Sequence, residues 1–157
     1  MRRRIIAPGL MLVLVLTSLA FQCGGGGGNN SNSDPKRRYV KALDDMAGGI
    51  NAMIKAKRQL AQSGRLSRDE ELRLTNQLLT ANNAVTAAFN MVKSLTTVDA
   101  TNKQQLVQLF AAVTTAINDL GTSLPTFGNA EAKERLQKIF AGVTAALAII
   151  NTLQNQT

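Results

Sequence analysis

Apolar residues recur along residues 35–155 at alternating spacings of four and three. The pattern occupies four segments separated by short polar stretches, and no segment sustains the every-second-residue alternation of a strand. Alternating spacings of four and three place apolar side chains on one stripe of an α-helix. The sequence therefore predicts an all-α domain of four amphipathic helices, at about 35–63, 68–95, 100–120 and 130–155.

The apolar stripes form the predicted core. In the first two helices they comprise Tyr39, Leu43, Met46, Ile50, Met53, Lys57 and Leu60, then Leu74, Leu78, Ala81, Val85, Ala88, Val92 and Leu95. In the last two they comprise Leu106, Phe110, Val113, Ile117 and Leu120, then Ala132, Leu136, Ile139, Val143, Ala146, Ile150 and Leu153. Several positions are alanine, which favours close packing of the helices and leaves little room for a cavity between them.

Residues typical of helix caps stand at the predicted boundaries. Asp34, Ser67, Asp99 and Asn129 precede the four helices, and Ser67 with Glu70 has the spacing of a capping box. Gly64 and Gly121 are expected to end the first and third helices. Gly48-Gly49 lies inside the first helix and indicates either a close helix contact or a kink.

The predicted loops are short, at roughly 64–67, 96–99 and 121–129. Short connections make consecutive long helices antiparallel, so the sequence predicts an antiparallel up-down-up-down four-helix bundle over residues 35–157.

Residues 1–22 have the pattern of an export signal. Three arginines at positions 2–4 precede an apolar run at 10–16, and this run is shorter than the roughly 20 residues that a membrane-spanning helix needs. Small residues at Ser18 and Ala20 are compatible with cleavage after Ala20 by an ordinary signal peptidase, which would leave a secreted protein with a lone thiol.

A second cleavage pattern involves Cys23, the single cysteine, which directly follows the apolar segment. This arrangement resembles a bacterial lipoprotein signal, in which the cysteine becomes lipid-modified and forms the new N-terminus. Gln22 departs from the small residue that such signals prefer before the cysteine. The resemblance covers residues 1–28 and implies lipid attachment at Cys23. Gly24, in place of an aspartate, implies the outer membrane in a Gram-negative host.

Residues 24–33 read GGGGGNNSNS and are predicted to form a linker. A tract without apolar side chains cannot bury a core and behaves as a flexible coil, so residues 23–34 are assigned as the lipid-attachment cysteine and its tether.

The formal charge of +8 changes once the signal is set aside. Removal of three arginines lowers it to +5, and the remaining excess falls on the first helix and the start of the second. One basic group, beside the tether, is a candidate for contact with a membrane surface: Lys36, Arg37, Arg38 and Lys41. The alternative is a solvated helix start.

A second candidate site lies at the opposite end of the predicted bundle and would bind a partner protein or an anionic envelope polymer. Its members are Lys55, Lys57, Arg58, Arg65, Arg68, Leu124 and Phe127. Alternatively, Leu124 and Phe127 plug that end of the bundle, and the cations are solvated.

Composition excludes several classes of chemistry. Without histidine the chain cannot use histidine as a general base or as a metal ligand, and a single cysteine cannot form an intrachain disulfide. We expect no cofactor, no metal and no catalytic site. Nucleic acid is disfavoured as a partner because the chain is predicted to be exported and is poor in aromatic residues for base stacking.

These features predict an exported, lipid-anchored protein of the cell envelope that acts as a non-catalytic interaction or structural module. The alternative is a soluble periplasmic carrier that binds a small apolar ligand between the helices. A cavity lined by Phe110, Ile139 and Val143 would favour the carrier.

Overall fold

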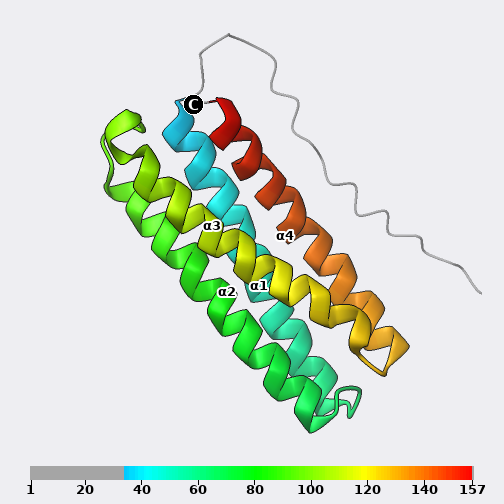
Figure 1. Cartoon of the computed structure of the whole chain (residues 1–157). Helices are drawn as coiled ribbons and strands as arrows, with labels where there is room; N and C mark the ends of the chain where they lie inside the picture. The colour runs from blue at the N-terminus through cyan, green and yellow to red at the C-terminus, as the bar shows by residue number, and fades with distance from the viewer. Residues whose placement is uncertain (1–33, 157) are drawn as a thin grey trace, which may run out of the picture. The chain divides into compact units, whose positions relative to one another are not determined.

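The computed structural model describes residues 34–156, and this part of the chain is all helical. Four α-helices span Pro35–Gln62 (α1), Arg68–Ser94 (α2), Ala100–Ser123 (α3) and Ala130–Gln156 (α4), and a short 3-10 turn, η1, covers Leu124–Thr126. Figure 1 shows the four helices packed side by side as a bundle. The all-α prediction is thus confirmed, whereas the predicted signal segment, Cys23 and the linker before residue 34 lie outside the described residues.

Contacts at the helix ends define two ends of the bundle. At the entry end, Lys36 at the start of α1 bonds Leu95 after α2, and Arg38 bonds Gln156 at the end of α4. At the far end, Lys57 of α1 bonds Thr75 of α2, and residues of α1 and the loop after it meet the start of α4. α1 contacts α2 and α4 extensively and α3 packs on α2, while α3 and α4 meet less extensively.

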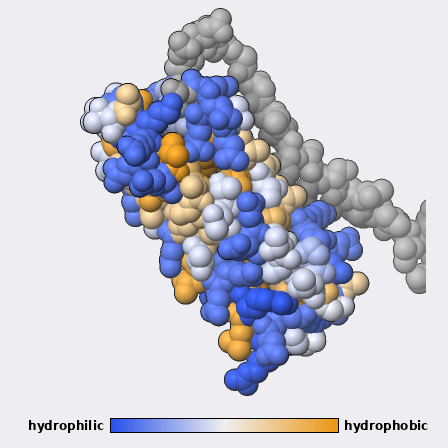
Figure 2. Space-filling model, in the orientation of Figure 1, coloured by the Kyte–Doolittle hydropathy of each residue, from blue (hydrophilic) through white to orange (hydrophobic). Residues whose placement is uncertain are grey.

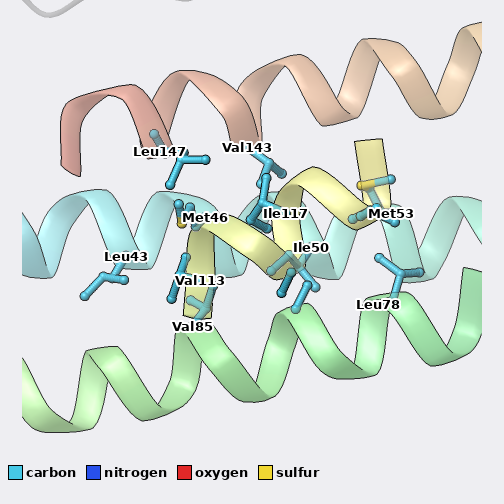
Figure 3. Packing of buried hydrophobic residues seen from close by; sticks show 14 of the residues in the cluster. Leu43, Met46, Ile50, Met53, Leu78, Val85, Val113, Ile117, Val143 and Leu147 are labelled. Carbon is cyan, nitrogen blue, oxygen red and sulfur yellow. The ribbon is translucent and has the colours of Figure 1, made fainter. Parts of the chain in front are cut away.

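The predicted stripes form the core. Every stripe residue except Lys57, Leu95 and Ile139 is buried, and Figure 3 shows α1 residues such as Met46 and Ile50 packed among residues of the other helices. In α1 the buried position is Ala56, so Lys57 sits at the edge of the core with a side chain 13% exposed. Removing this apolar area from water is the main source of the bundle's stability.

Four predicted caps form as expected. The side chains of Asp34, Ser67, Asp99 and Asn129 accept hydrogen bonds from backbone N–H groups in the first turns of α1, α2, α3 and α4. The Ser67–Glu70 capping box is complete. Gly64 has a φ of 68°, which permits the left-handed conformation just after α1 ends.

The predicted end of the third helix is wrong. Gly121 does not end it: α3 continues to Ser123, and η1 follows through Pro125. A Cβ atom at Gly121 would stand 2.9 Å from the Phe140 ring, so this glycine makes room for the Phe140 side chain between α3 and α4. Pro125 then lies within the 3-10 turn, where its missing N–H group costs no helical hydrogen bond.

The two glycines within α1 have different surroundings. A Cβ atom at Gly49 would lie 2.5 Å from Val143 Cγ2, whereas one at Gly48 would meet nothing within 4 Å. Gly49 therefore allows α1 and α4 to approach closely, which agrees with the close helix contact that the sequence offered as an alternative to a kink. α1 continues through both glycines.

Candidate functional site

Two of the four basic residues at the entry end bond neighbouring helices. The Lys36 ammonium donates to the carbonyl oxygen of Leu95, just past α2, and Arg38 Nη1 donates to Gln156 Oε1 in the last turn of α4 at 3.3 Å. The C-terminal end of a helix is electronegative and has carbonyl groups without helical partners. Lys36 and Arg38 therefore stabilise the ends of α2 and α4, which is a structural role that the sequence alone does not reveal.

The other two members of this group face solvent. Lys41 Nζ is 3.0 Å from Asp45 Oδ2, one turn further along α1, and its side chain is 76% exposed. Arg37 is exposed, and no hydrogen bond or ion pair joins its side chain to another residue of the described range 34–156. Within this group, Arg37 is thus the residue whose guanidinium is open to a ligand from outside.

A groove, which we call the entry groove, separates the start of α1 from the end of α2. It has a volume of about 610 Å³ and is lined by Asp34, Lys36, Arg37, Val40, Lys41, Asp44, Phe89 and Thr96. Lys93 stands over Phe89, with Nζ 5.1 Å from the ring centroid, a cation–π contact. Sequence reasoning missed Phe89 and Lys93. The available signal was an aromatic residue one position off the α2 stripe with a lysine one turn later.

At the far end, two of the predicted cations are held by carboxylates or hydroxyls. Lys57 Nζ donates to Thr75 Oγ1 at 2.7 Å and lies 3.8 Å from Glu71 Oε1, and Arg65 pairs with Glu131 of α4. These contacts join α1 and the loop after it to the first two turns of α2 and the first turn of α4.

The remaining far-end candidates divide into exposed and buried residues. Lys55, Arg58 and Arg68 are exposed, without a bond to another side chain among residues 34–156. Leu124 and Phe127 are buried, at 1% and 2% exposure, so the expectation that they could meet a partner from outside is wrong. They plug the far end of the bundle because η1 turns both side chains into the core. The Arg73 guanidinium lies 5.5 Å from the Phe127 ring centroid.

A smaller groove of about 210 Å³ lies between α1 and α2 near the far end. Its lining is Ile54, Lys57, Arg58, Thr75, Leu78, Leu79 and Asn82. Leu79 and, about two turns away on α2, Leu72 are more than half exposed. On the face seen in Figure 2, hydrophobic residues form small separate patches among hydrophilic ones.

Carboxylate caps occur at both ends. Glu70 Oε1 accepts from the backbone N–H of Gly128 at 2.8 Å, while Oε2 accepts from Ser67. The hydrogen bond from Gly128, followed by that from Ser67, lowers the pKa of Glu70. The backbone N–H of Thr101 similarly lowers the pKa of Asp99. Glu70 therefore ties the start of α2 to the loop before α4, a longer-range link than a capping box alone provides.

The space beside Phe110 gives no support to an apolar carrier. A cavity lined by Tyr39, Phe110 and neighbouring residues holds about 10 Å³, roughly the limit for a single water. The rings of Tyr39 and Phe110 are stacked with centroids 5.0 Å apart and fill the centre of the entry end. Within residues 34–156 no three His, Cys, Asp or Glu side chains gather as a metal site.

α4 is the one helix in the described part of the chain that is long and apolar enough, by length and composition, to cross a membrane. A third of its most apolar 18-residue stretch is buried inside the domain, and core helices of water-soluble proteins can be equally long and apolar. This property by itself does not assign α4 to a membrane.

Comparison of the chain with protein-family models, with curated proteins and with solved structures finds no match.

Proposed function

We propose that this chain is an exported lipoprotein of the cell envelope, whose up-down-up-down four-helix bundle is a non-catalytic interaction module held close to a membrane. The observation that carries the proposal is the order of its parts. A basic and apolar leader is followed by Cys23, then by a Gly/Asn/Ser tract, and then directly by the first helix cap at Asp34. Lipid attachment at Cys23 would place the bundle on a short tether.

The contacts at the helix ends support this topology. The start of α1 meets the ends of α2 and α4, and the end of α2 leads through a five-residue connection into α3. In an antiparallel arrangement the tether, the entry groove and the end of α4 share one end. A ten-residue coil has an end-to-end reach of about 16–19 Å, so this end would stay near the membrane surface.

The surface supports an interaction role more than a catalytic one. Among the described residues, the pKa shifts belong to Glu70 and Asp99, and hydrogen bonds that cap helices explain both of them. Perturbed groups in a catalytic cleft would instead face a substrate. The exposed cations at both ends offer surfaces for anionic partners, whether an envelope polymer or a protein.

The experiment is a comparison of wild type and Cys23→Ala by intact mass and by partition between membrane and soluble fractions. Lipidation predicts an added acyl mass on a chain beginning at Cys23, and loss of both that mass and the membrane association in the variant. A wild-type protein that is soluble and begins at Phe21 would refute the anchor and favour a secreted bundle. If Gly24 directs the protein to an outer membrane, Gly24→Asp should move it to the inner-membrane fraction.

A further inference from the structure

The entry groove contains cations that the fold itself does not use. Lys36 is committed to the Leu95 carbonyl and Lys41 to Asp45. Arg37 has no such partner among residues 34–156, and Lys93 stands over the Phe89 ring, where its ammonium keeps donors for an incoming acceptor. Arg37, at the start of α1, thus lines the groove, and Lys93, at the end of α2, stands over Phe89, which lines it too.

The carboxylates in and around the groove do not cancel its positive charge. Asp34 and Asp44 line it, and Asp45 neutralises Lys41. Asp34 is already occupied as the cap of α1, where its Oδ1 accepts from the backbone N–H of Lys36 at 3.0 Å. With Lys36, Arg37, Lys41 and Lys93 against these three carboxylates, the site favours an anion over a cation.

The floor of the groove is apolar. Val40 and Phe89 line it, and both are half-buried residues packed against the core. A cationic rim over an apolar floor matches the boundary of a lipid bilayer, where phosphate groups lie directly above hydrocarbon. Arginine suits phosphate in particular, because its planar fork can donate two parallel hydrogen bonds to it.

The groove is also where the described chain begins. Asp34 lies in its lining, so the residues that precede the bundle leave from its rim. If those residues end in a lipid at Cys23, the groove is held within the reach of the tether from a membrane surface. The location therefore depends on the anchor proposed above, while the chemistry of the groove depends only on the bundle.

We propose that the entry groove binds the phosphate of an anionic phospholipid headgroup, with Arg37 and Lys93 as the ligands and Val40 and Phe89 against the upper acyl region. The anchor would bring the bundle to the membrane, and the groove would orient it there.

The test uses the full-length chain carrying Cys23→Ala, so that no acyl group contributes, and measures partition onto phosphatidylcholine vesicles with and without phosphatidylglycerol. The parent should bind only the vesicles that contain phosphatidylglycerol. Arg37→Gln and Lys93→Gln should each lower the partition coefficient about fivefold, and the double variant about 25-fold, as expected for independent cations near an anionic surface. Whatever residues 1–33 contribute is common to every variant and cancels.

The matched control is Lys133→Gln with Lys138→Gln, which removes the same charge from positions on α4 that belong to neither candidate site. It should bind within about twofold of the parent, and thermal unfolding should show that both double variants are folded. Equal losses in the two double variants would overturn the proposal in favour of a net-charge effect. Unchanged binding by the groove variant would overturn it outright. Polyglutamate binding as tight as vesicle binding, with the same dependence on Arg37, would replace the lipid with an acidic polymer.

This result is independent of the anchor experiment. Acylation of Cys23 could be present while the groove fails to bind vesicles, or the groove could bind them in a chain that is never acylated, and each outcome identifies which proposal is wrong.

Discussion

The two ends of the bundle both carry several cations, but the partners of these cations differ between the ends. At the far end, Arg65 pairs with Glu131, and Lys57 bonds Thr75 and lies near Glu71. Leu124 and Phe127 are buried at the same end. At the entry end, Lys36 bonds the residue just beyond α2 and Arg38 bonds the last turn of α4. Arg37 lines an open groove there, and Lys93 stands over Phe89 in its lining.

This difference follows from the first turns of the helices. α2 and α4, which start at the far end, carry acidic residues there, whereas α1 and α3, which start at the entry end, carry none. The far end gathers the starts of α2 and α4, whose first-turn acids attract the cations of α1 and its loop: Asp69, Glu70, Glu71 and Glu131. The entry end gathers the ends of α2 and α4, where the carbonyl groups accept only a few lysine or arginine donors. At the far end, Lys57 and Arg65 therefore hold helices together while Lys55, Arg58 and Arg68 stay exposed, and at the entry end the exposed Arg37 lines the larger groove.

The largest expected effect is at the far-end plug. Phe127→Ala should lower the free energy of unfolding by about 3–5 kcal/mol, because it removes a fully buried ring and leaves a cavity. Phe89→Ala, in the half-buried floor of the entry groove, should cost clearly less. Chemical denaturation followed by circular dichroism measures both. Equal losses would show that the entry end is sealed as tightly as the far end.

The next effect concerns Glu70, which links α2 to the loop before α4. Glu70→Ala should cost about 1–2 kcal/mol at neutral pH, because the N–H groups of Gly128 and Ser67 both lose their acceptor. Asp69→Ala, next to it in the same first turn, is the control and should cost less.

The pH dependence of this loss has a defined sign. Folding lowers the pKa of Glu70, so the ionised carboxylate contributes its full stability above the unfolded-state pKa of about 4.3. This contribution disappears as the pH falls through the lower pKa of the folded state. The difference in unfolding free energy between wild type and Glu70→Ala should therefore narrow in acid. A difference that stays constant from neutral pH into that acidic range would mean that Glu70 acts through packing alone.

A smaller effect separates the structural cation of the entry end from the available one. Lys36→Gln should lower the free energy of unfolding by about 1 kcal/mol, since the Leu95 carbonyl loses a charged donor at the end of α2. Arg37→Gln, one residue along, should change it by less than about 0.5 kcal/mol. If the two substitutions were equally costly, Arg37 would have a partner within the fold, and the proposed headgroup ligand would be lost.

Local chemistry explains which parts of this structure the sequence could predict. Spacings of four and three and the caps at Ser67 and Asp99 act within one helix, and they place the helices nearly to the residue. The predicted end of α3 at Gly121 is wrong because this glycine makes room for the Phe140 ring, 19 positions away, and does not terminate its own helix. The role of Leu124 and Phe127 stays open in the sequence because apolar residues in a loop can either plug the end of a bundle or form an exposed contact surface.

The candidate site was less predictable than the fold for a related reason. The basic group at the start of α1 is visible in the sequence, but its division into structural and available members depends on partners up to 118 positions away. Phe89, with Lys93 over its ring, joins the groove only because the end of α2 lies beside the start of α1. Charge pattern along one helix predicts where cations gather, and only the packing of neighbouring helices decides which of them remain for a ligand.

The smallest effect is expected at the Lys41–Asp45 pair, which lies on α1 beside the entry groove. Both side chains are largely exposed, so Lys41→Ala or Asp45→Ala should each cost only about 0.3–0.5 kcal/mol, and concentrated salt should abolish the coupling that a double-mutant cycle measures. Vesicle binding separates the two residues, however. Asp45→Ala frees a lysine beside the groove and should strengthen binding to phosphatidylglycerol, whereas Lys41→Ala removes a cation and should weaken it. If both substitutions shifted binding in the same direction, the pair would act through the stability of α1 and not through the charge of the groove.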